Sequence, residues 1–233
     1  MNDRVQPAIV VFPASNCERD MELILKELYG FSPLMIWHEE DAIPKNVTHL
    51  ILPGGFSFGD HLRAGALAKS SLIMPAIRRF SIMGGDILGI CNGFQILCEL
   101  GLLPGALLKN PSDRFICKEE LVTFFGIKKP LAHPKKLRLP IAHREGRYFA
   151  GPDTMADIKT TNLIALSYDH RDGDDDASVN GSKMGIGGLI GGPKRNIVGM
   201  MPHPERAARW FLPNRDGCVI LNEFFYGQDY EAR

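Results

Sequence analysis

The feature that most constrains the fold is the apolar segment 86–90, which runs directly into Gly89-Ile90-Cys91-Asn92-Gly93. The pattern G-x-C-x-G at the end of a strand predicts a sharp turn into a helix, because glycines on either side of the cysteine leave room for a tight backbone. The residues that follow have helical periodicity up to a stop at Gly101. A strand that passes at once into a helix is typical of a parallel sheet covered by helices.

The rest of the first half has the same alternation of short apolar runs and amphipathic stretches. Ser15-Asn16-Cys17-Glu18 has the spacing of a capping box, which predicts a helix from there to about Tyr29, with Gly30 as its stop. A longer helical pattern covers residues 64–80, and Pro75 is expected to kink or split it. The predicted strands before the turn are residues 8–12, 34–37 and 49–52. This half therefore predicts a doubly wound α/β sheet.

The second half has a different pattern, of strands joined by turns. It predicts an antiparallel insertion, a last core strand and two terminal helices, with no internal repeat or linker, so residues 1–233 are expected to form a single domain. The acidic stretch 172–176 is expected to be a solvated loop, and the glycine-rich stretch 185–192 a hairpin turn. The predicted strands are residues 107–109, 115–125, 137–142, 163–168 and 196–200, and the predicted helices are 205–211 and 216–226.

Composition excludes several classes of function. The 27 basic and 27 acidic residues balance, which argues against a nucleic acid or a membrane surface as a polyelectrolyte partner. No stretch approaches the roughly 18 apolar residues of a membrane span. The five cysteines have neither disulfide-framework nor zinc-ribbon spacing. We therefore expect a cytoplasmic protein with free thiols and no metal site.

Cys91 is the candidate nucleophile. At a strand-to-helix turn its sulfur stands above the carboxyl edge of the sheet, where the helix N-terminus favours the thiolate. The amide of Asn92 then points to where an oxyanion would form. The alternative for an isolated G-x-C-x-G is a buried small hydrophobe in a tight turn, the role we assign to Cys98.

Two other segments strengthen the catalytic interpretation. Gly54 and Gly55 follow a neighbouring predicted strand and can offer a second amide to the oxyanion. His203, which follows the last predicted core strand, can take the thiol proton and return it to a leaving amine. Glu205, two residues later, can hold the imidazole in the required tautomer. All these segments are expected at one sheet edge, where open α/β sheets bind ligands.

Four strings make the chain similar to a known family. It resembles the class I (triad-type) glutamine amidotransferases and, among these, the glutaminase subunits of phosphoribosylformylglycinamidine synthases. The length is similar to that of the free-standing subunit. The strings are Pro53-Gly54-Gly55-Phe56-Ser57-Phe58-Gly59-Asp60-His61-Leu62-Arg63-Ala64-Gly65, Cys91-Asn92-Gly93-Phe94-Gln95, Asn180-Gly181-Ser182 and Gly199-Met200-Met201-Pro202-His203-Pro204-Glu205-Arg206.

The resemblance implies a flavodoxin-like, mostly parallel sheet and the glutaminase reaction. Cys91 would attack the side-chain amide of L-glutamine, His203 would be general acid and base, and Glu205 would orient it. Gly54, Gly55 and Asn92 would form the oxyanion and substrate site, which Gln95 would complete. The ammonia would pass to the synthetase subunit of phosphoribosylformylglycinamidine synthase, an ATP-dependent C–N ligase, in a complex with a small bridging subunit. This subunit would need no cofactor, because the synthetase uses the ATP and Mg.

One departure from the family concerns Arg144, where the family usually has glycine. Either the loop is arranged differently or a contact with the partner has changed. The preceding His143 is a candidate for the lining of the site, although an ordinary polar loop is the alternative. Three other functions stay open: a glutaminase for another synthetase, a cysteine-elbow chaperone or peptidase, and a catalytically silent scaffold.

Overall fold

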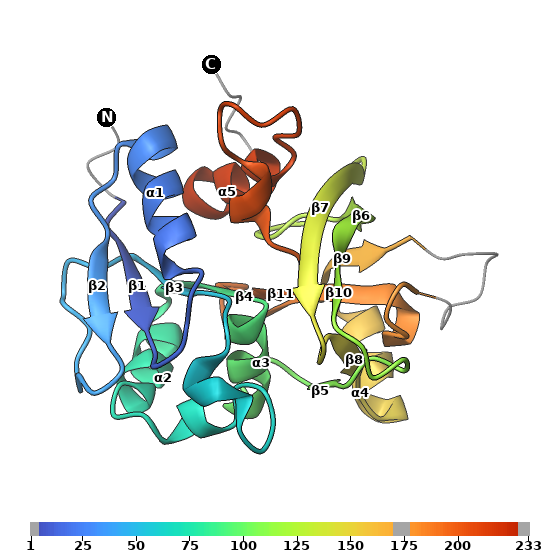
Figure 1. The fold of residues 1–233 in the computed structure, drawn as a ribbon, viewed down its shortest axis with the longest axis horizontal. Coiled ribbons are helices and arrows are strands. Elements are labelled where there is room, and N and C mark those ends of the chain that lie inside the picture. The colour runs from blue at the N-terminus through green and yellow to red at the C-terminus, as the bar shows by residue number, and fades with distance from the viewer. Residues whose placement is uncertain (1–4, 170–177, 228–233) are drawn as a thin grey trace.

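The computed structural model describes residues 5–169 and 178–227, and its centre is one nine-stranded mixed sheet (Figure 1). In sheet order the strands are β2 (Leu34–Trp37), β1 (Pro7–Val11), β3 (His49–Leu52), β4 (Asp86–Ile90), β11 (Ile197–Met200), β10 (Ile186–Gly191), β9 (Ile164–Tyr168), β6 (Ile116–Phe124) and β7 (Lys135–His143). The first five strands in sheet order, β2-β1-β3-β4-β11, are mutually parallel. This is the strand order of a flavodoxin-like sheet, with β11 in the place of the fifth strand, and it confirms the predicted fold class.

Helices cover both faces of the parallel part. Figure 1 shows α1 (Glu18–Tyr29) and α5 (Gly217–Tyr226) on one side, with α2 (Met74–Met83) and α3 (Asn92–Glu99) on the other. The apolar positions of each helix recur at helical spacing and face the sheet: in α1 the buried residues are Met21, Ile24 and Leu25. The strands between the two helical layers are almost continuously buried, as expected for a parallel sheet that is covered on both faces.

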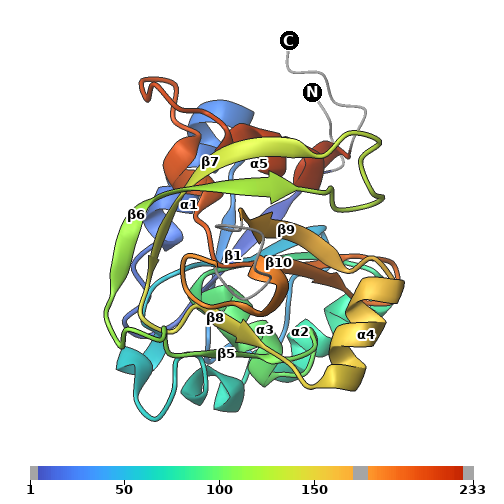
Figure 2. The same ribbon diagram turned by 90° about the vertical axis from the view of Figure 1, so that its right-hand side faces the viewer.

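The antiparallel insertion is also confirmed. β10, β9, β6 and β7 continue the sheet in antiparallel pairs. Figure 2 shows the β6–β7 hairpin curving over the face that carries α1 and α5. A separate two-stranded ribbon is formed by β5 (Ala106–Leu108) and β8 (Arg147–Phe149), and the short helix α4 (Pro152–Thr160) follows it. Sequence patterns predicted neither β8 nor α4.

The prediction of a hairpin turn at residues 185–192 is wrong, because most of this stretch forms the buried strand β10. Its glycines mark places where neighbouring groups come too close for a side chain. A Cβ on Gly188 would lie 2.9 Å from the carbonyl oxygen of Gly199, and one on Gly187 would lie 2.7 Å from Leu166. Glycine inside a strand is a signature of such close approach as well as of turns.

Two helix predictions need correction, and the expected effect of Pro75 is confirmed. The hydroxyl of Ser15 bonds Phe12 instead of capping α1, whose N-cap is Cys17. Pro75 splits the predicted helix, because it stands in the first turn of α2 after a separate 3-10 turn, η2 (Leu67–Ser70). The predicted helix 205–211 is only the 3-10 turn η4 (Pro204–Ala207). The loop predicted at 172–176 lies outside the described residues.

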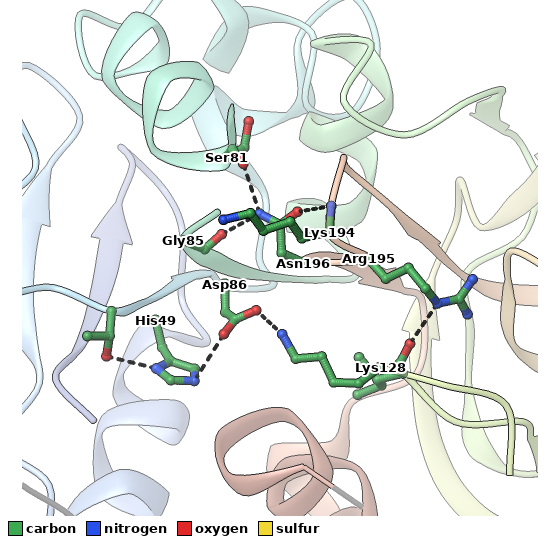
Figure 3. Close-up of polar contacts among 10 residues, drawn as sticks. His49, Ser81, Gly85, Asp86, Lys128, Lys194, Arg195 and Asn196 are labelled. Atoms are coloured by element: carbon green, nitrogen blue, oxygen red, sulfur yellow. Dashed lines mark hydrogen bonds and ion pairs between the residues drawn. The ribbon is translucent and has the colours of Figure 1, made fainter. Parts of the chain in front are cut away.

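At the amino edge of the parallel strands, the side chain of Asn196 joins two neighbouring segments through three backbone groups (Figure 3). Its buried amide donates to the carbonyl oxygens of Ser81 at 2.9 Å and Gly85 at 2.7 Å, and its oxygen accepts from the backbone of Lys194 at 3.3 Å. One side chain thereby satisfies backbone groups at the end of α2 and at the start of β11. Buried polar groups of this kind stabilise the fold when all their partners are present.

A second cluster of polar side chains at this edge is centred on Asp86 (Figure 3). The carboxylate pairs with Lys128 and lies 3.6 Å from Nε2 of His49, whose Nδ1 bonds the hydroxyl of Thr48 at 2.9 Å. Burial lowers the pKa of His49 to about 4, although Asp86 acts in the opposite direction. None of the helices within the described ranges is long and apolar enough to cross a membrane.

Candidate active site

Three adjacent parallel strands deliver the predicted site residues to one edge of the sheet. β3 ends two residues before Gly54, β4 ends directly before Cys91, and β11 leads to His203. The backbone N–H of Cys91 donates to the carbonyl oxygen of Met200 at 2.7 Å, so β4 and β11 stay paired up to the turn. The carboxyl ends of neighbouring strands thus bring together segments more than a hundred residues apart in the chain.

Cys91 has the strained backbone of a nucleophile elbow. Its φ is 50° and its ψ is −102°, a region that side-chain-bearing residues rarely adopt. The two glycines of the motif are required by packing: a Cβ on Gly93 would lie 2.0 Å from the carbonyl oxygen of Leu52, and one on Gly89 would lie 2.5 Å from Leu97. Strain of this kind persists only where the surrounding structure enforces it, which favours a functional thiol over a packing residue.

His203 and Glu205 form a buried pair. Each side chain is 1% exposed, and Nδ1 of His203 lies 2.6 Å from a carboxylate oxygen of Glu205. Burial alone would lower the pKa of His203, but Glu205 and the nearby thiols of Cys91 and Cys17 together raise it well above its usual value. The backbone N–H of His203 donates to Pro140 on β7 at 2.8 Å, so the antiparallel insertion also positions the imidazole.

A small cavity of about 170 Å³ opens in front of these groups. Cys91 and His203 line it, together with Gly55. Gly54 leaves the space between the groups open, because a Cβ there would lie 2.7 Å from Cε1 of His203 and 3.4 Å from Cβ of Cys91. The sequence assigned no role in the site to the other residues that line the cavity, which are Asn16, Cys17, Phe56, Phe115, Cys117, Ala142 and Arg206.

Two backbone amides stand next to the thiol. Asn92 is the first residue of α3, so its N–H has no acceptor within the helix. Gly55 has a φ of 131°, a conformation open to glycine, and within residues 5–169 and 178–227 its N–H donates to no backbone carbonyl. Backbone amides without an acceptor in the protein are the groups that form oxyanion holes, so the predicted roles of Gly55 and Asn92 stay predictions.

The side chain of Asn92 fastens the loop that carries Gly55. Its oxygen accepts from the backbone of Ser57 at 3.2 Å, and its nitrogen donates to Asp60 at 3.3 Å and to Gln95 at 2.9 Å. Both residues on the loop belong to the 3-10 turn η1 (Ser57–Asp60). Burial and Glu145 raise the pKa of Asp60 to about 6, against the effect of Asn92.

Both the oxygen and the nitrogen of the Gln95 side-chain amide form hydrogen bonds within the protein. Its oxygen accepts from Asn92, and its nitrogen donates to the carbonyl oxygen of Glu145 at 2.6 Å. The carboxylate of Glu145 in turn accepts from the backbone of Ala64 at 3.1 Å. The predicted role of Gln95 in holding glutamine stays a prediction, and these contacts favour an indirect role through the loops.

His143 lies at the end of β7 and is 2% exposed. Burial and the neighbouring His203 lower its pKa to about 4, and neither ring nitrogen has a hydrogen-bond partner among the described residues. The adjacent Arg144 does not have positive φ, so an arginine at this position causes no backbone strain of the kind that glycine would relieve. Its guanidinium pairs with Asp113 at 2.9 Å, which lowers the pKa of that carboxyl.

Cys17 and Arg206 are the most informative residues that sequence reasoning missed. Arg206 donates to the sulfur of Cys17 at 3.1 Å and also pairs with Asp20 at 3.8 Å. The available signal was positional, because Cys17 follows β1 at the same sheet edge as Cys91. Among the residues the structure describes, only Cys17, His203 and Glu205 form a group that could hold a metal ion, with one ligand atom from each within 4.8 Å of the others.

Comparison with known proteins gives a consistent result. Residues 4–216 match the family model of the CobB/CobQ-like glutamine amidotransferase domain. The PurQ subunit of phosphoribosylformylglycinamidine synthase from Thermus thermophilus is 46% identical over 218 residues, 92% of this chain and 95% of the relative. The PurQ subunit from Zymomonas mobilis is 40% identical over 217 residues, 91% of this chain and 95% of the relative.

Solved structures agree with these relatives. A chain in the structure of PurLQS from Thermotoga maritima superposes with a TM-score of 0.81 at 37% identity, covering 95% of this chain and 97% of that one. The glutaminase domain of a Trypanosoma brucei CTPS has the same fold, with a TM-score of 0.57 at 14% identity over 97% of this chain and 96% of that one. The chain therefore belongs to the class I glutamine amidotransferases, in the family of the PurQ subunits of phosphoribosylformylglycinamidine synthase.

Proposed function

We propose that this chain releases ammonia from L-glutamine at Cys91 as the glutaminase subunit of phosphoribosylformylglycinamidine synthase, in purine biosynthesis. The observation that carries the proposal is the meeting of a strained cysteine elbow with the buried pair of His203 and Glu205. A nucleophile, a base and a group that orients the base are the parts that acyl transfer requires. The family membership supplies the substrate.

The reaction takes place in two steps. The sulfur of Cys91 attacks the side-chain carbonyl carbon of glutamine, and His203 transfers the thiol proton to the leaving nitrogen, so ammonia departs and a γ-glutamyl thioester remains. Water, deprotonated by His203, then cleaves the thioester and releases glutamate. Glu205 accepts from Nδ1 of His203, so that Nε2 handles the proton. The amides of Gly55 and Asn92 stabilise the oxyanion in both steps.

The size of the cavity supports a single amino acid as substrate. At about 170 Å³ it is below the roughly 300–1,000 Å³ of pockets for drug-sized ligands. It therefore favours glutamine over the extended chain that a peptidase binds. We propose that Gly54 keeps the space between Cys91 and His203 open. Gln95, through its bonds to Asn92 and Glu145, holds the loops around this cavity in place.

The ammonia requires an acceptor outside this chain. The Thermotoga maritima relative belongs to a PurLQS assembly, and we propose an equivalent complex here, with an ATP- and Mg-dependent synthetase and a small bridging subunit. The synthetase converts formylglycinamide ribonucleotide to the amidine. We also propose that residues 1–233 act as one domain and work in the cytoplasm, where the five free cysteines stay reduced.

One reconstitution experiment tests the proposal. The chain is combined with the synthetase, the bridging subunit, ATP and formylglycinamide ribonucleotide, and either glutamine or ammonia supplies the nitrogen. Cys91→Ala is expected to abolish the glutamine-driven rate and to leave the ammonia-driven rate intact. Cys98→Ala, a matched change on the same helix, is expected to support both.

Other outcomes separate the alternatives. A glutamine-driven rate in Cys91→Ala equal to that of the parent would exclude Cys91 as the nucleophile. A parent that works only with a different synthetase would reassign the partner. A parent that hydrolyses no glutamine with any partner would favour the chaperone or scaffold interpretation.

A further inference from the structure

A second cavity, of about 200 Å³, lies at the amino end of β11, whose other end leads to the active site. None of the residues that line it has a part in the proposed reaction. Its walls come from segments far apart in the chain: the loop after β6 with Phe125 and Leu131, α4 with Ile158, β9 with Ile164, and the turn before β11 with Arg195. The cavity therefore lies where the antiparallel insertion meets the parallel part of the sheet.

The walls of this cavity are mostly apolar, and the fold holds them in place. Ile158 is 1% exposed, and Leu131 and Ile164 pack against the buried core. The backbone N–H of Leu131 donates to the carbonyl oxygen of Phe125 at 2.7 Å, which closes the loop that carries both residues. The N–H of Phe125 in turn donates to Ala165 on β9 at 2.8 Å. A pre-formed apolar cavity with a few polar groups is typical of a site for a small organic molecule.

Arg195 brings a positive charge without a negative partner to the cavity. Its Nε donates to the carbonyl oxygen of Ile127 at 3.4 Å, and its Nη2 donates to that of Asn162 at 3.1 Å. No carboxylate within residues 5–169 and 178–227 forms an ion pair with it. Burial lowers the pKa of this half-buried guanidinium below its usual value, as expected for a cation that lacks a negative neighbour.

The hydrogen bonds of Arg195 leave the end of its guanidinium fork free. The two carbonyl oxygens occupy the side edge, formed by Nε and one hydrogen of Nη2. The end edge, formed by Nη1 and the other hydrogen of Nη2, accordingly remains available for an acceptor. Figure 3 shows the terminal nitrogens of Arg195 on the side away from Asp86. Two parallel N–H groups match the two oxygens of a carboxylate, so Arg195 can form a bidentate pair with a ligand in the cavity.

Two further features favour an anion. Lys159, in the last turn of α4, also lines the cavity, whereas none of the lining residues is acidic. The backbone of Arg195 has a φ of 53°, which side-chain-bearing residues rarely adopt, and its N–H is held by the carbonyl oxygen of Gly192 at 3.2 Å. The turn thereby fixes the direction from which the guanidinium enters. An apolar cavity with two cations and no acid has an excess of positive charge.

We propose that this cavity binds a carboxylate carried on a small apolar body, such as a single aromatic ring. Arg195 and Lys159 bind the carboxylate, and the ring packs between Phe125, Leu131 and Ile158. The volume limits the size of the ligand: an apolar cavity of about 150 Å³ holds one benzene ring, so about 200 Å³ accommodates a ring with one carboxylate. A bare anion would leave the apolar walls unfilled, and a neutral ring would leave the guanidinium without its partner.

Three probes of matched structure test the class of ligand on the full chain. Benzoate has the ring and the charge, benzamide has the ring alone, and acetate has the charge alone. Benzoate is expected to bind at millimolar concentration and to shift the NMR signals of amides in residues 125–131 and 158–164 and of the Nε–H of Arg195. Benzamide and acetate are each expected to bind at least about tenfold more weakly, because each lacks one of the two contacts. Saturating benzoate should also raise the Tm by mass action.

Three variants test the residues assigned to the carboxylate. Arg195→Gln is expected to weaken benzoate binding at least about tenfold and to bind benzoate and benzamide equally well. Lys159→Gln, a change on the exposed side of α4, is expected to weaken benzoate binding roughly threefold. Arg79→Gln is the matched control, because Arg79 is an exposed arginine of α2 outside this cavity, and it should bind benzoate like the parent. Circular dichroism verifies the fold of each variant.

Several outcomes would overturn the proposal. These are a parent whose signals do not shift with millimolar benzoate, shifts confined to other parts of the chain, and acetate or benzamide binding as tightly as benzoate. An Arg195→Gln variant that binds benzoate like the parent would do the same. The comparison of probes needs only the parent, so it decides the question even if Arg195→Gln does not fold. None of these measurements depends on the proposed glutaminase function.

Discussion

Gly54→Ala is expected to slow the glutamine-driven reaction without unfolding the protein. The added Cβ would lie 2.7 Å from Cε1 of His203, about 0.7 Å short of the 3.4 Å of ordinary contact, and 3.1 Å from Sγ of Cys17. Gly54 does not have positive φ, so the effect is one of space rather than of backbone strain. The imidazole must therefore move away from Cys91 or tilt.

The size of the effect follows from this displacement. A misplacement of about 1 Å in a reacting group can cost roughly 100-fold in rate, so a shift of about 0.7 Å predicts a 10- to 100-fold lower kcat. This corresponds to about 1.4–2.7 kcal/mol in the activation free energy. The crowding itself is expected to lower the free energy of unfolding by about 1–3 kcal/mol.

The assay compares kcat for glutamine-driven amidine formation with the ammonia-driven rate, which the change is expected to leave unaffected. Gly151→Ala is the matched control, because a Cβ there meets nothing within 4 Å and its φ is −69°. Denaturant unfolding of both variants separates crowding from global destabilisation. A Gly54→Ala enzyme with the kcat of the parent would refute the assigned spacing between His203 and Cys91.

Three further predictions concern other parts of the structure. Glu205→Gln is expected to lower the glutamine-driven kcat by roughly 10³- to 10⁴-fold, because an amide no longer fixes the tautomer of His203; a loss below tenfold would contradict the orienting role. Asn196→Leu leaves two backbone carbonyls without their donor and is expected to lower the free energy of unfolding by about 3 kcal/mol. Denaturant titration measures this loss, and an unchanged free energy of unfolding would contradict the prediction. The pKa values of His49 and His143 are lowered to about 4 in the folded protein, so between about pH 6.5 and 4 the unfolded chain binds more protons than the folded one. The free energy of unfolding should therefore fall as pH decreases over this range, by up to about 3 kcal/mol for each histidine. The parent is compared over this range with the double variant H49Q/H143Q, and equal pH dependence of the two would contradict the prediction.

The sequence was most informative where local pattern and fold agree. The elbow at Cys91 predicted both its strained turn and the parallel sheet beneath it, because G-x-C-x-G after a strand has few other solutions. The meeting of Cys91 and His203 was predictable as well, since both follow strands whose carboxyl ends share an edge. Such arguments require only the strand assignment and the rule that parallel strands point the same way.

Other features depend on packing that no local pattern reveals. The glycines of β10 have the composition of a turn, but they allow close contact with neighbouring strands. Ser15 has the spacing of a cap, but its hydroxyl bonds back to Phe12, and α1 begins three residues later. Cys17 had no distinctive flanks, so its place in the cavity became visible only once the strand ends were placed together.

The central claim is that Cys91 forms a covalent bond with the glutamyl group of the substrate. The most direct measurement mixes the complex with glutamine, quenches it in acid within one turnover and maps modified peptides by mass spectrometry. We expect one γ-glutamyl group on the peptide that carries Cys91, and longer-lived labelling in a variant that hydrolyses the thioester slowly. Turnover of glutamine with the label on another cysteine, or with no labelled peptide at any quench time, would contradict the account.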